Sequence, residues 1–81
     1  MGHNFNLQTI KSQVKLILKT VLEVNVNADA SVQNIHSWDS LNYLVIVASL
    51  EKEFNIEFDP DELIELNSFQ NIVSILSRKL S

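Results

Sequence analysis

The sequence predicts an all-α protein, a four-helix bundle with a long first loop and a short third helix. The 81 residues are 46% hydrophobic and include only one glycine and one proline. Hydrophobic residues also recur at a spacing of three and four, which is the pattern of amphipathic helices. This composition is typical of a compact helical domain and not of a turn-rich β protein or a disordered chain. We expect one domain over residues 1–81, with residues 1–5 frayed.

The first helix is expected from about residue 6 to residue 24. Lys11, Lys15 and Lys19 are four residues apart and should lie on its solvent face. Its apolar side would carry Leu7, Ile10, Val14, Ile17, Leu18, Val21 and Leu22. Residues 25–37 that follow are rich in Asn, Asp, Ser and Ala without periodicity, so they predict a long loop.

The loop is expected to be anchored in the core by Val32 and Ile35. A long loop in a small domain commonly has a functional role. It ends at Trp38, which we interpret as a residue that packs the loop and not as a ligand contact.

The second helix is expected to begin at the tetrad Trp38-Asp39-Ser40-Leu41. Asp39 has the side chain of an N-cap, which puts Ser40 at the first helical position. Trp38 before the cap and Tyr43 five residues later have the spacing of a hydrophobic staple. A serine at this position faces solvent beside the positive end of a helix dipole, where a phosphate is favoured.

The second helix should span residues 40–54 and be apolar on two sides. The side expected to face the core carries Tyr43, Ile46, Val47, Leu50 and Phe54. The other side, which includes Ser40 and which we call the apolar stripe, carries Leu41, Leu44, Val45 and Ala48. A helix that is apolar on two sides requires a second neighbour, which could be a short element, a ligand or another protein.

A short third helix is indicated by Asp59 as cap, Pro60 at the first position and Glu62 three residues after the cap. It is expected to end near Leu66. The fourth helix should then begin at Asn67 or Ser68, with Arg78 and Lys79 matching its C-terminal dipole. Its buried face would consist of Ile72, Val73, Ile75, Leu76 and Leu80.

The charge of the chain is distributed unevenly. The net charge is −4, but residues 39–65 contain eight acidic residues against the single base Lys52. Nucleic acid and anionic membranes are therefore poor partners, and a basic protein surface is a better one. The longest apolar run, residues 44–48, is too short to span a bilayer. We expect a monomeric cytoplasmic protein.

The sequence disfavours catalysis and metal binding. Ser40, Asp39 and His36 lie within five residues, but a capping Asp39 is already engaged and no glycine-lined elbow exposes the serine. His3 and His36 are far apart, and without cysteine they form no familiar ligand set. The acids of residues 59–65 lack the glycine of a calcium-binding loop. We expect no catalytic residue and no metal, so the protein should not be an enzyme.

These elements together give the chain a resemblance to acyl carrier proteins that runs nearly from end to end. The likeness rests on the long first helix and loop, on Asp39-Ser40-Leu41 opening the second helix, and on the acidic stretch of residues 50–58 before the short third helix. The resemblance implies an acyl-carrier-like bundle with 4′-phosphopantetheine attached to Ser40, beside Asp39 and Leu41. A phosphopantetheinyl transferase would attach this arm from coenzyme A, and acyl groups would be held on it as thioesters.

The resemblance also implies partner enzymes. An acyl ligase or acyltransferase would load the arm, and downstream enzymes of lipid metabolism such as fatty acid biosynthesis would use the acyl group. We place the partner-binding surface at Leu44, Val45, Ala48 and Glu51.

The chain departs from the pattern of fatty acid carriers at several positions. Ser37 and Trp38 stand where a pair of small residues is typical, and Asn42 and Val45 stand where acids are typical. At matching positions the acids that remain are Asp39, Glu51 and Glu53. These differences favour a specialised carrier over a housekeeping one. A peptidyl or aminoacyl carrier, although its double glycine is missing, and an unmodified helical interaction module stay open as alternatives.

Overall fold

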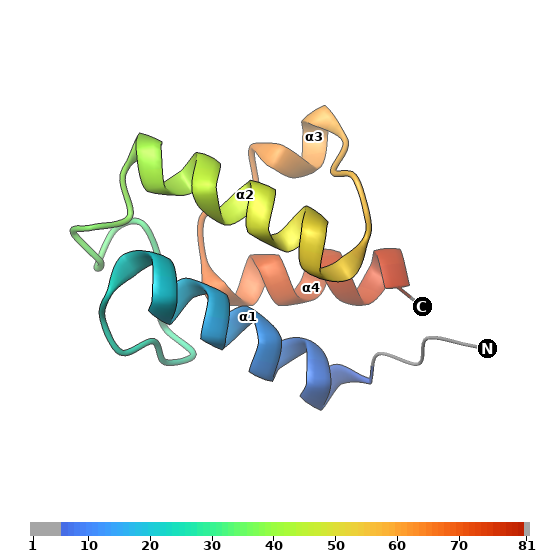
Figure 1. Ribbon diagram of the computed structural model, residues 1–81, viewed down its shortest axis with the longest axis horizontal. Coiled ribbons are helices and arrows are strands. Elements are labelled where there is room, and N and C mark those ends of the chain that lie inside the picture. Colours follow the sequence, from blue (N-terminus) through green and yellow to red (C-terminus); the bar gives the residue numbers. More distant parts are fainter. Residues whose placement is uncertain (1–5, 81) are drawn as a thin grey trace.

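Four helices joined by one long loop and short connections make up the computed structural model, which describes residues 6–80 (Figure 1). They are α1 (Leu7–Leu22), α2 (Ser40–Phe54), α3 (Pro60–Leu63) and α4 (Phe69–Leu80). Within the described range, the β-type pairing consists of one isolated bridge between Ser31 and Ser68. The prediction of an all-α, four-helix protein is confirmed. The expectations for residues 1–5, including His3, fall outside the described residues.

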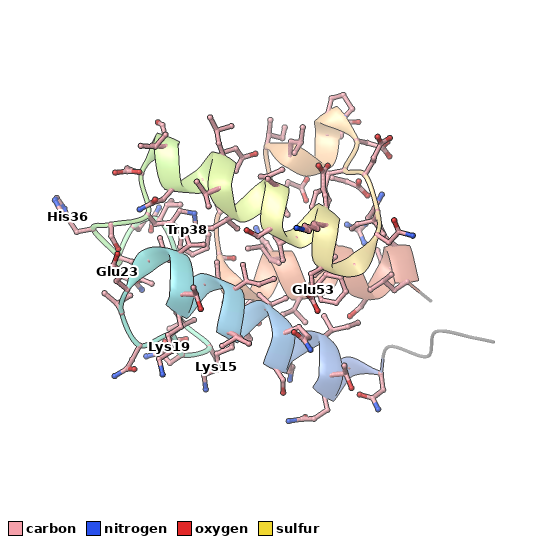
Figure 2. The ribbon with its side chains drawn as sticks, viewed as in Figure 1. Lys15, Lys19, Glu23, His36, Trp38 and Glu53 are labelled. Carbon is pink, nitrogen blue, oxygen red and sulfur yellow. The ribbon has the colours of Figure 1, made fainter. Side chains whose placement is uncertain are left out.

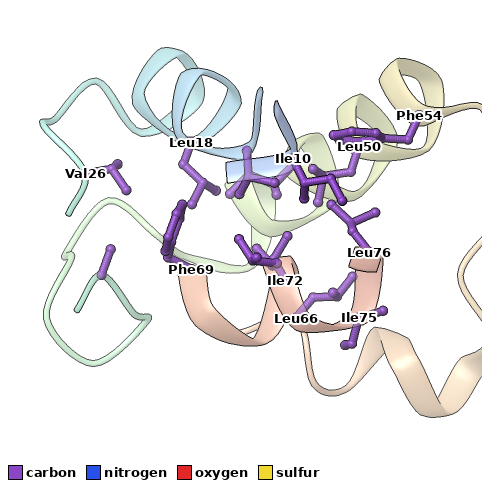
Figure 3. Close-up of a cluster of buried hydrophobic side chains, with 14 of the residues drawn as sticks. Ile10, Leu18, Val26, Leu50, Phe54, Leu66, Phe69, Ile72, Ile75 and Leu76 are labelled. Atoms are coloured by element: carbon purple, nitrogen blue, oxygen red, sulfur yellow. The ribbon is translucent and has the colours of Figure 1, made fainter. Parts of the chain in front are cut away.

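The hydrophobic core lies between the three longer helices α1, α2 and α4 (Figure 3). Helix α1 packs against both of the others. On α2 the core side is the predicted one, with Ile46, Leu50 and Phe54 buried and Tyr43 and Val47 half-buried. The most completely buried side chains are Ile10, Val14, Leu18, Leu22, Ile46, Leu50, Leu66, Ile72, Ile75 and Leu76. The three- and four-residue spacing in the sequence therefore corresponds to real burial on each long helix.

Two helices end earlier than the sequence predicts. Helix α1 ends at Leu22 because Glu23 adopts a left-handed conformation (φ 58°) and donates its N–H to the carbonyl of Lys19 at 2.8 Å. Helix α3 ends at Leu63 and not near Leu66, since the chain turns there and carries Leu66 into the core. Left-handed residues other than glycine and asparagine are uncommon, so the position of Glu23 has no clear signal in the sequence.

The loop between α1 and α2 is tied to the start of α4. The N–H of Phe69 donates to the Ala30 carbonyl at 2.9 Å, and the N–H of Val32 donates to the Asn67 carbonyl at 3.0 Å. The expectation that Val32 anchors the loop in the core was wrong, because its side chain is 42% exposed. Val32 lies on the outside of a turn that brings Ile35 back against the core.

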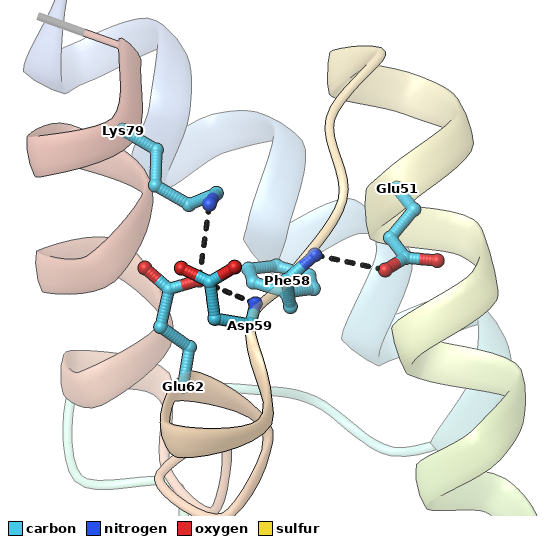
Figure 4. A network of polar contacts seen from close by, with 5 residues as sticks. All are labelled: Glu51, Phe58, Asp59, Glu62 and Lys79. Atoms are coloured by element: carbon cyan, nitrogen blue, oxygen red, sulfur yellow. Dashed lines mark hydrogen bonds and ion pairs between the residues drawn. The ribbon is translucent and has the colours of Figure 1, made fainter.

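Helix α3 is held by polar contacts, since none of its residues is buried. The Asp59 N–H donates to Oε1 of Glu62 at 2.8 Å, and Nζ of Lys79 contacts the same oxygen at 3.0 Å (Figure 4). The N–H of Phe58 donates to Oε2 of Glu51 at 3.0 Å, which joins α2 to the segment before α3. The cap predicted at Asp59 and Glu62 is therefore present, and α4 reinforces it.

The Glu62→Gln variant is expected to lose stability at neutral pH but not in acid. The hydrogen bond from the Asp59 backbone and then the Lys79 ammonium lower the pKa of the Glu62 carboxyl below its usual range. A carboxyl with a lowered folded-state pKa stabilises the fold above its unfolded-state pKa, and this contribution disappears as the pH falls through the folded-state value. Urea unfolding over a pH series should therefore show wild type and variant converging in acid. Glu65→Gln, which removes the same charge from an exposed position, is the control, and a constant difference between wild type and Glu62→Gln at every pH would contradict the prediction.

Candidate functional site

The candidate site lies where the long loop meets α2. Asp39 has extended backbone geometry, and its Oδ1 accepts the N–H of Asn42 at 2.9 Å, so it is the predicted N-cap. Nδ2 of Asn42 donates to the carbonyl of Ser37 at 2.8 Å, and the Ser37 hydroxyl donates to the carbonyl of Leu22 at 2.9 Å. These bonds join the start of α2 to the end of α1, a link that the sequence did not reveal.

Ser40 is the first residue of α2 and its side chain is exposed, as predicted. Helix geometry leaves the first amide groups without carbonyl partners inside the helix, so a phosphate on the Ser40 hydroxyl would face the positive end of the dipole. His36 is exposed and projects from the loop into solvent (Figure 2).

A hollow of about 440 Å³ opens beside Ser40. The loop and the first turns of α2 form its walls, with Val32, Trp38, Asp39, Ser40, Tyr43 and Leu44. Trp38 is 4% exposed, which confirms that it packs the loop (Figure 2). Its Nε1–H has no hydrogen-bond acceptor among the described residues. An unpaired buried donor of this kind costs about 1–3 kcal/mol.

Tyr43 also lines this hollow and connects α2 to α3. Its hydroxyl donates to the carbonyl of Leu63, and burial raises the pKa of this phenol above its usual range. The sequence placed Tyr43 in a staple with Trp38, and both side chains line the same hollow. The contact with Leu63 was not predicted, because it joins residues twenty positions apart.

The apolar stripe is exposed over its whole length. Leu41 is 71%, Leu44 62% and Val45 44% exposed, and Ala48 is exposed as well. These residues follow Ser40 along one side of α2, which makes a continuous apolar surface next to the serine. Such a surface is suited to contact with another protein or a ligand.

The two acidic residues of α2, Glu51 and Glu53, differ in burial and in their position around the helix. Glu51 is half-buried and accepts the Phe58 N–H, so part of its carboxylate is used to hold the connection to α3. Glu53 is exposed, and the 100° step of an α-helix puts it about half a turn around α2 from Leu44. Only Glu51 therefore lies at the end of the apolar stripe, where it combines a structural contact with partial exposure.

Within residues 6–80, no group of three or more His, Asp or Glu side chains is placed to hold a metal ion. None of the helices in this range is both long and apolar enough to cross a membrane.

Asp39→Ala is expected to lower the free energy of unfolding by about 1 kcal/mol, because the N–H of Asn42 loses its acceptor. Thermal or urea unfolding measures the change. Asp39→Ser keeps a capping oxygen and serves as the control, which should recover most of the loss. Equal stability of wild type and Asp39→Ala would show that the cap contributes nothing.

Comparison with known proteins gives matches over most of the chain. A family model described as "Phosphopantetheine attachment site" matches residues 8–76. An acyl carrier protein of Guillardia theta is 32% identical over 79 residues, which cover 94% of this chain and 98% of that protein. An acyl carrier protein of Petrotoga mobilis is 32% identical over 72 residues, or 85% of each chain. An acyl carrier protein of Buchnera aphidicola is 25% identical over 76 residues, or 90% of this chain and 96% of that protein.

The family match includes α2, α3 and the loop that presents Ser40, together with most of α1 and α4. It agrees with the all-α fold and with an exposed serine at the start of α2. The domain matched by the family model is one that carries a covalently attached 4′-phosphopantetheine group. The chain belongs to the acyl carrier protein family.

Proposed function

We propose that Ser40 holds the 4′-phosphopantetheine arm and that the protein, as a single carrier domain, presents acyl groups bound to this arm as thioesters. The observation that supports this most directly is an exposed serine at the first position of a capped helix, inside the region matched by the family model. Asp39 supports the helix start and Leu41 completes the motif. Acyl carrier proteins are carriers and not catalysts, so we assign no catalytic residue.

The residues around Ser40 fit this group. Ser40 is exposed, so its hydroxyl is accessible to a transferase. In the transferase reaction the serine oxygen would attack the phosphorus of coenzyme A that carries the pantetheine. A phosphodiester would form, and adenosine 3′,5′-bisphosphate would be released. The helix start favours the negative charge of that phosphodiester. The arm supplies a thiol that the chain, which has no cysteine, lacks. A half-open hollow next to the serine provides room for the part of the arm nearest the protein.

Mass spectrometry of the modified protein tests the proposal. Wild-type protein incubated with coenzyme A and a phosphopantetheinyl transferase should gain the mass of one phosphopantetheine group, and fragmentation should map it to Ser40. No gain in mass, or attachment at another residue, would contradict the proposal.

The proposed partner surface follows the apolar stripe of α2 and ends at Glu51. Leu44, Val45 and Ala48 expose apolar side chains beside Ser40, and Glu51 lies at the far end. Contact with this surface depends on apolar complementarity more than on charge, since Val45 stands where fatty acid carriers typically have an acid. This supports a specialised pathway with a dedicated acyl ligase or acyltransferase. We also propose that the protein acts as a cytoplasmic monomer.

Val45→Glu is expected to reduce acyl loading by such a ligase at least tenfold, a loss of about 1.4 kcal/mol in transition-state binding. A carboxylate would replace an apolar contact and would be desolvated in the complex. The measurement is the rate at which an acyl ligase with ATP and a fatty acid loads the phosphopantetheine-bearing variant. Ser12→Glu adds the same charge at an exposed position of α1 and should load at the wild-type rate. Equal rates for all three proteins would exclude Val45 from the partner surface.

The identity of the cargo separates the remaining carrier alternatives. Loading by an amino-acid-activating enzyme but not by a fatty acid ligase would favour a peptidyl or aminoacyl carrier.

A further inference from the structure

One side of α1 carries positive charge that no acid of the fold neutralises. Residues 6–22 contain Lys11, Lys15 and Lys19 and no acidic residue, although the whole chain has a net charge of −4. All three lysines are exposed, and none of them forms an ion pair within residues 6–80. Figure 2 shows Lys15 and Lys19 on the side of α1 that faces away from α2. This basic side is therefore separate from Ser40 and from the apolar stripe.

The basic side borders a groove between α1 and the first part of the loop. A hollow of about 480 Å³ lies there, lined by Ser12, Lys15, Leu16, Lys19, Asn25 and Val26. A second hollow of about 270 Å³ shares Ser12 and Lys15 with the first and extends to Lys11 and Asn27. We call these two adjoining hollows the α1 groove. The nearby acids Glu23 and Asp29 line neither of them.

The lining of the α1 groove combines hydrogen-bond donors with an apolar contact. Lysine ammonium groups are donors only, and they match carboxylate oxygens. The side-chain amide of Asn25 adds a donor that makes no hydrogen bond within the described residues. Leu16 lies between Lys15 and Lys19 in the sequence, lines the same hollow and is 59% exposed. The groove therefore fits an anionic ligand that also has an apolar group.

The spacing of the lysines indicates the size of this ligand. Lys11 and Lys19 are eight residues apart, which corresponds to about 12 Å along a helix. One carboxylate or phosphate does not bridge that distance, whereas an extended polypeptide covers it with about four residues. The net negative charge and the acids of residues 39–65 repel nucleic acid and anionic membranes. An acidic polypeptide segment is the ligand that meets all of these conditions.

We propose that the α1 groove binds a short, extended, acidic segment of a partner protein. Carboxylates of the segment pair with Lys11, Lys15 and Lys19, and an apolar side chain of the segment covers Leu16. Since the groove faces away from α2, this partner stays bound while another protein contacts the apolar stripe. The surface is independent of the attachment proposed at Ser40.

A titration of the ¹⁵N-labelled protein with an acetylated peptide of alternating glutamate and leucine tests the proposal. Changes in amide chemical shift should be confined to residues 8–19 and 25–28, and binding should weaken as salt is added. A peptide with lysine in place of glutamate should leave these resonances unchanged. No shifts, shifts concentrated on residues 40–48, or equal shifts with both peptides would overturn the proposal.

Charge reversal at one lysine separates the groove from the net charge of the protein. Lys15 lines both hollows, so Lys15→Glu should weaken binding of the acidic peptide roughly fivefold, because one exposed attraction becomes a repulsion. Lys52→Glu makes the same change in net charge at an exposed position of α2 and should bind the peptide like wild type. Equal weakening in the two variants would overturn the proposal.

Truncation of the exposed leucine tests the apolar contact. Leu16→Ala should weaken binding roughly threefold, since less apolar surface is removed from water in the complex. Leu41→Ala makes the same truncation on α2, at a side chain that is 71% exposed, and should leave the affinity unchanged. Unchanged binding by Leu16→Ala would overturn the apolar part of the contact.

Two other occupants of the α1 groove have their own signatures. Shifts of residues 8–19 that depend on protein concentration without peptide would assign the groove to a second copy of the chain. Binding to phosphatidylglycerol vesicles but not to the acidic peptide would assign it to a membrane surface. Either result would overturn the proposal of a partner protein. Neither would alter the gain of mass at Ser40, so the proposed function is tested separately.

Discussion

The Ser40→Ala variant is expected to lose phosphopantetheine attachment completely, and with it every thioester-bound acyl group. Alanine has no oxygen that could form the phosphodiester. Ser40 is exposed, and alanine is a good helix former, so the free energy of unfolding should change by no more than about 0.5 kcal/mol. Intact mass after incubation with coenzyme A and a transferase measures attachment, and thermal unfolding verifies the fold.

Ser49→Ala is the matched control, because it removes a hydroxyl from the same helix at a half-buried position. It should be modified to the same extent as wild type. If Ser40→Ala still gains the phosphopantetheine group, the attachment point is a different residue. If Ser40→Ala keeps its biological function and Val45→Glu destroys it, the protein is instead an unmodified helical interaction module.

Leu50→Ala is expected to lower the free energy of unfolding by about 3 kcal/mol. Leu50 is fully buried in the core between α1, α2 and α4 (Figure 3), and removing its side chain leaves a cavity that costs roughly 2–5 kcal/mol. Domains of this size have a total stability at the low end of about 5–15 kcal/mol, so the variant should be close to unfolding at room temperature. Urea unfolding followed by circular dichroism measures the loss.

Leu44→Ala provides the comparison on the same helix. Leu44 is 62% exposed, and its truncation should change stability by about 0.5 kcal/mol or less. Similar losses in the two variants would mean that α2 does not bury the side assigned to the core.

The parts of the fold that the sequence predicted are those that depend on residues close together in the chain. Asp39 caps α2 through the amide of Asn42, three residues away, and Asp59 and Glu62 form a cap over the same separation. Burial on the long helices follows from periodicity within one element. The position of Ser40 was predictable for the same reason.

The features that the sequence missed depend on residues brought together only by folding. Val32 was expected in the core, but its burial is decided by a backbone pairing with Asn67 that lies beyond any local pattern. The bond between Glu51 and Phe58 gives a structural role to an acid that sequence reasoning had assigned only to partner binding. The unpaired donor of Trp38 is a further example, because it depends on how the loop covers the ring.

The bonds that join the loop to both α1 and α4 have a geometric consequence for a carrier. Ser37 ties the start of α2 to Leu22 at the end of α1, and the bond from the Phe69 N–H to the Ala30 carbonyl ties the loop to α4, so the segment before Ser40 is held from two neighbouring helices. An arm attached to Ser40 would rotate about this residue. Its end could reach only the positions around Ser40 that the protein itself does not occupy. A partner enzyme then finds the cargo at a distance set by its own docking position on α2. On the proposed function, the docking position of the enzyme on α2 would therefore decide whether the thioester reaches its active site.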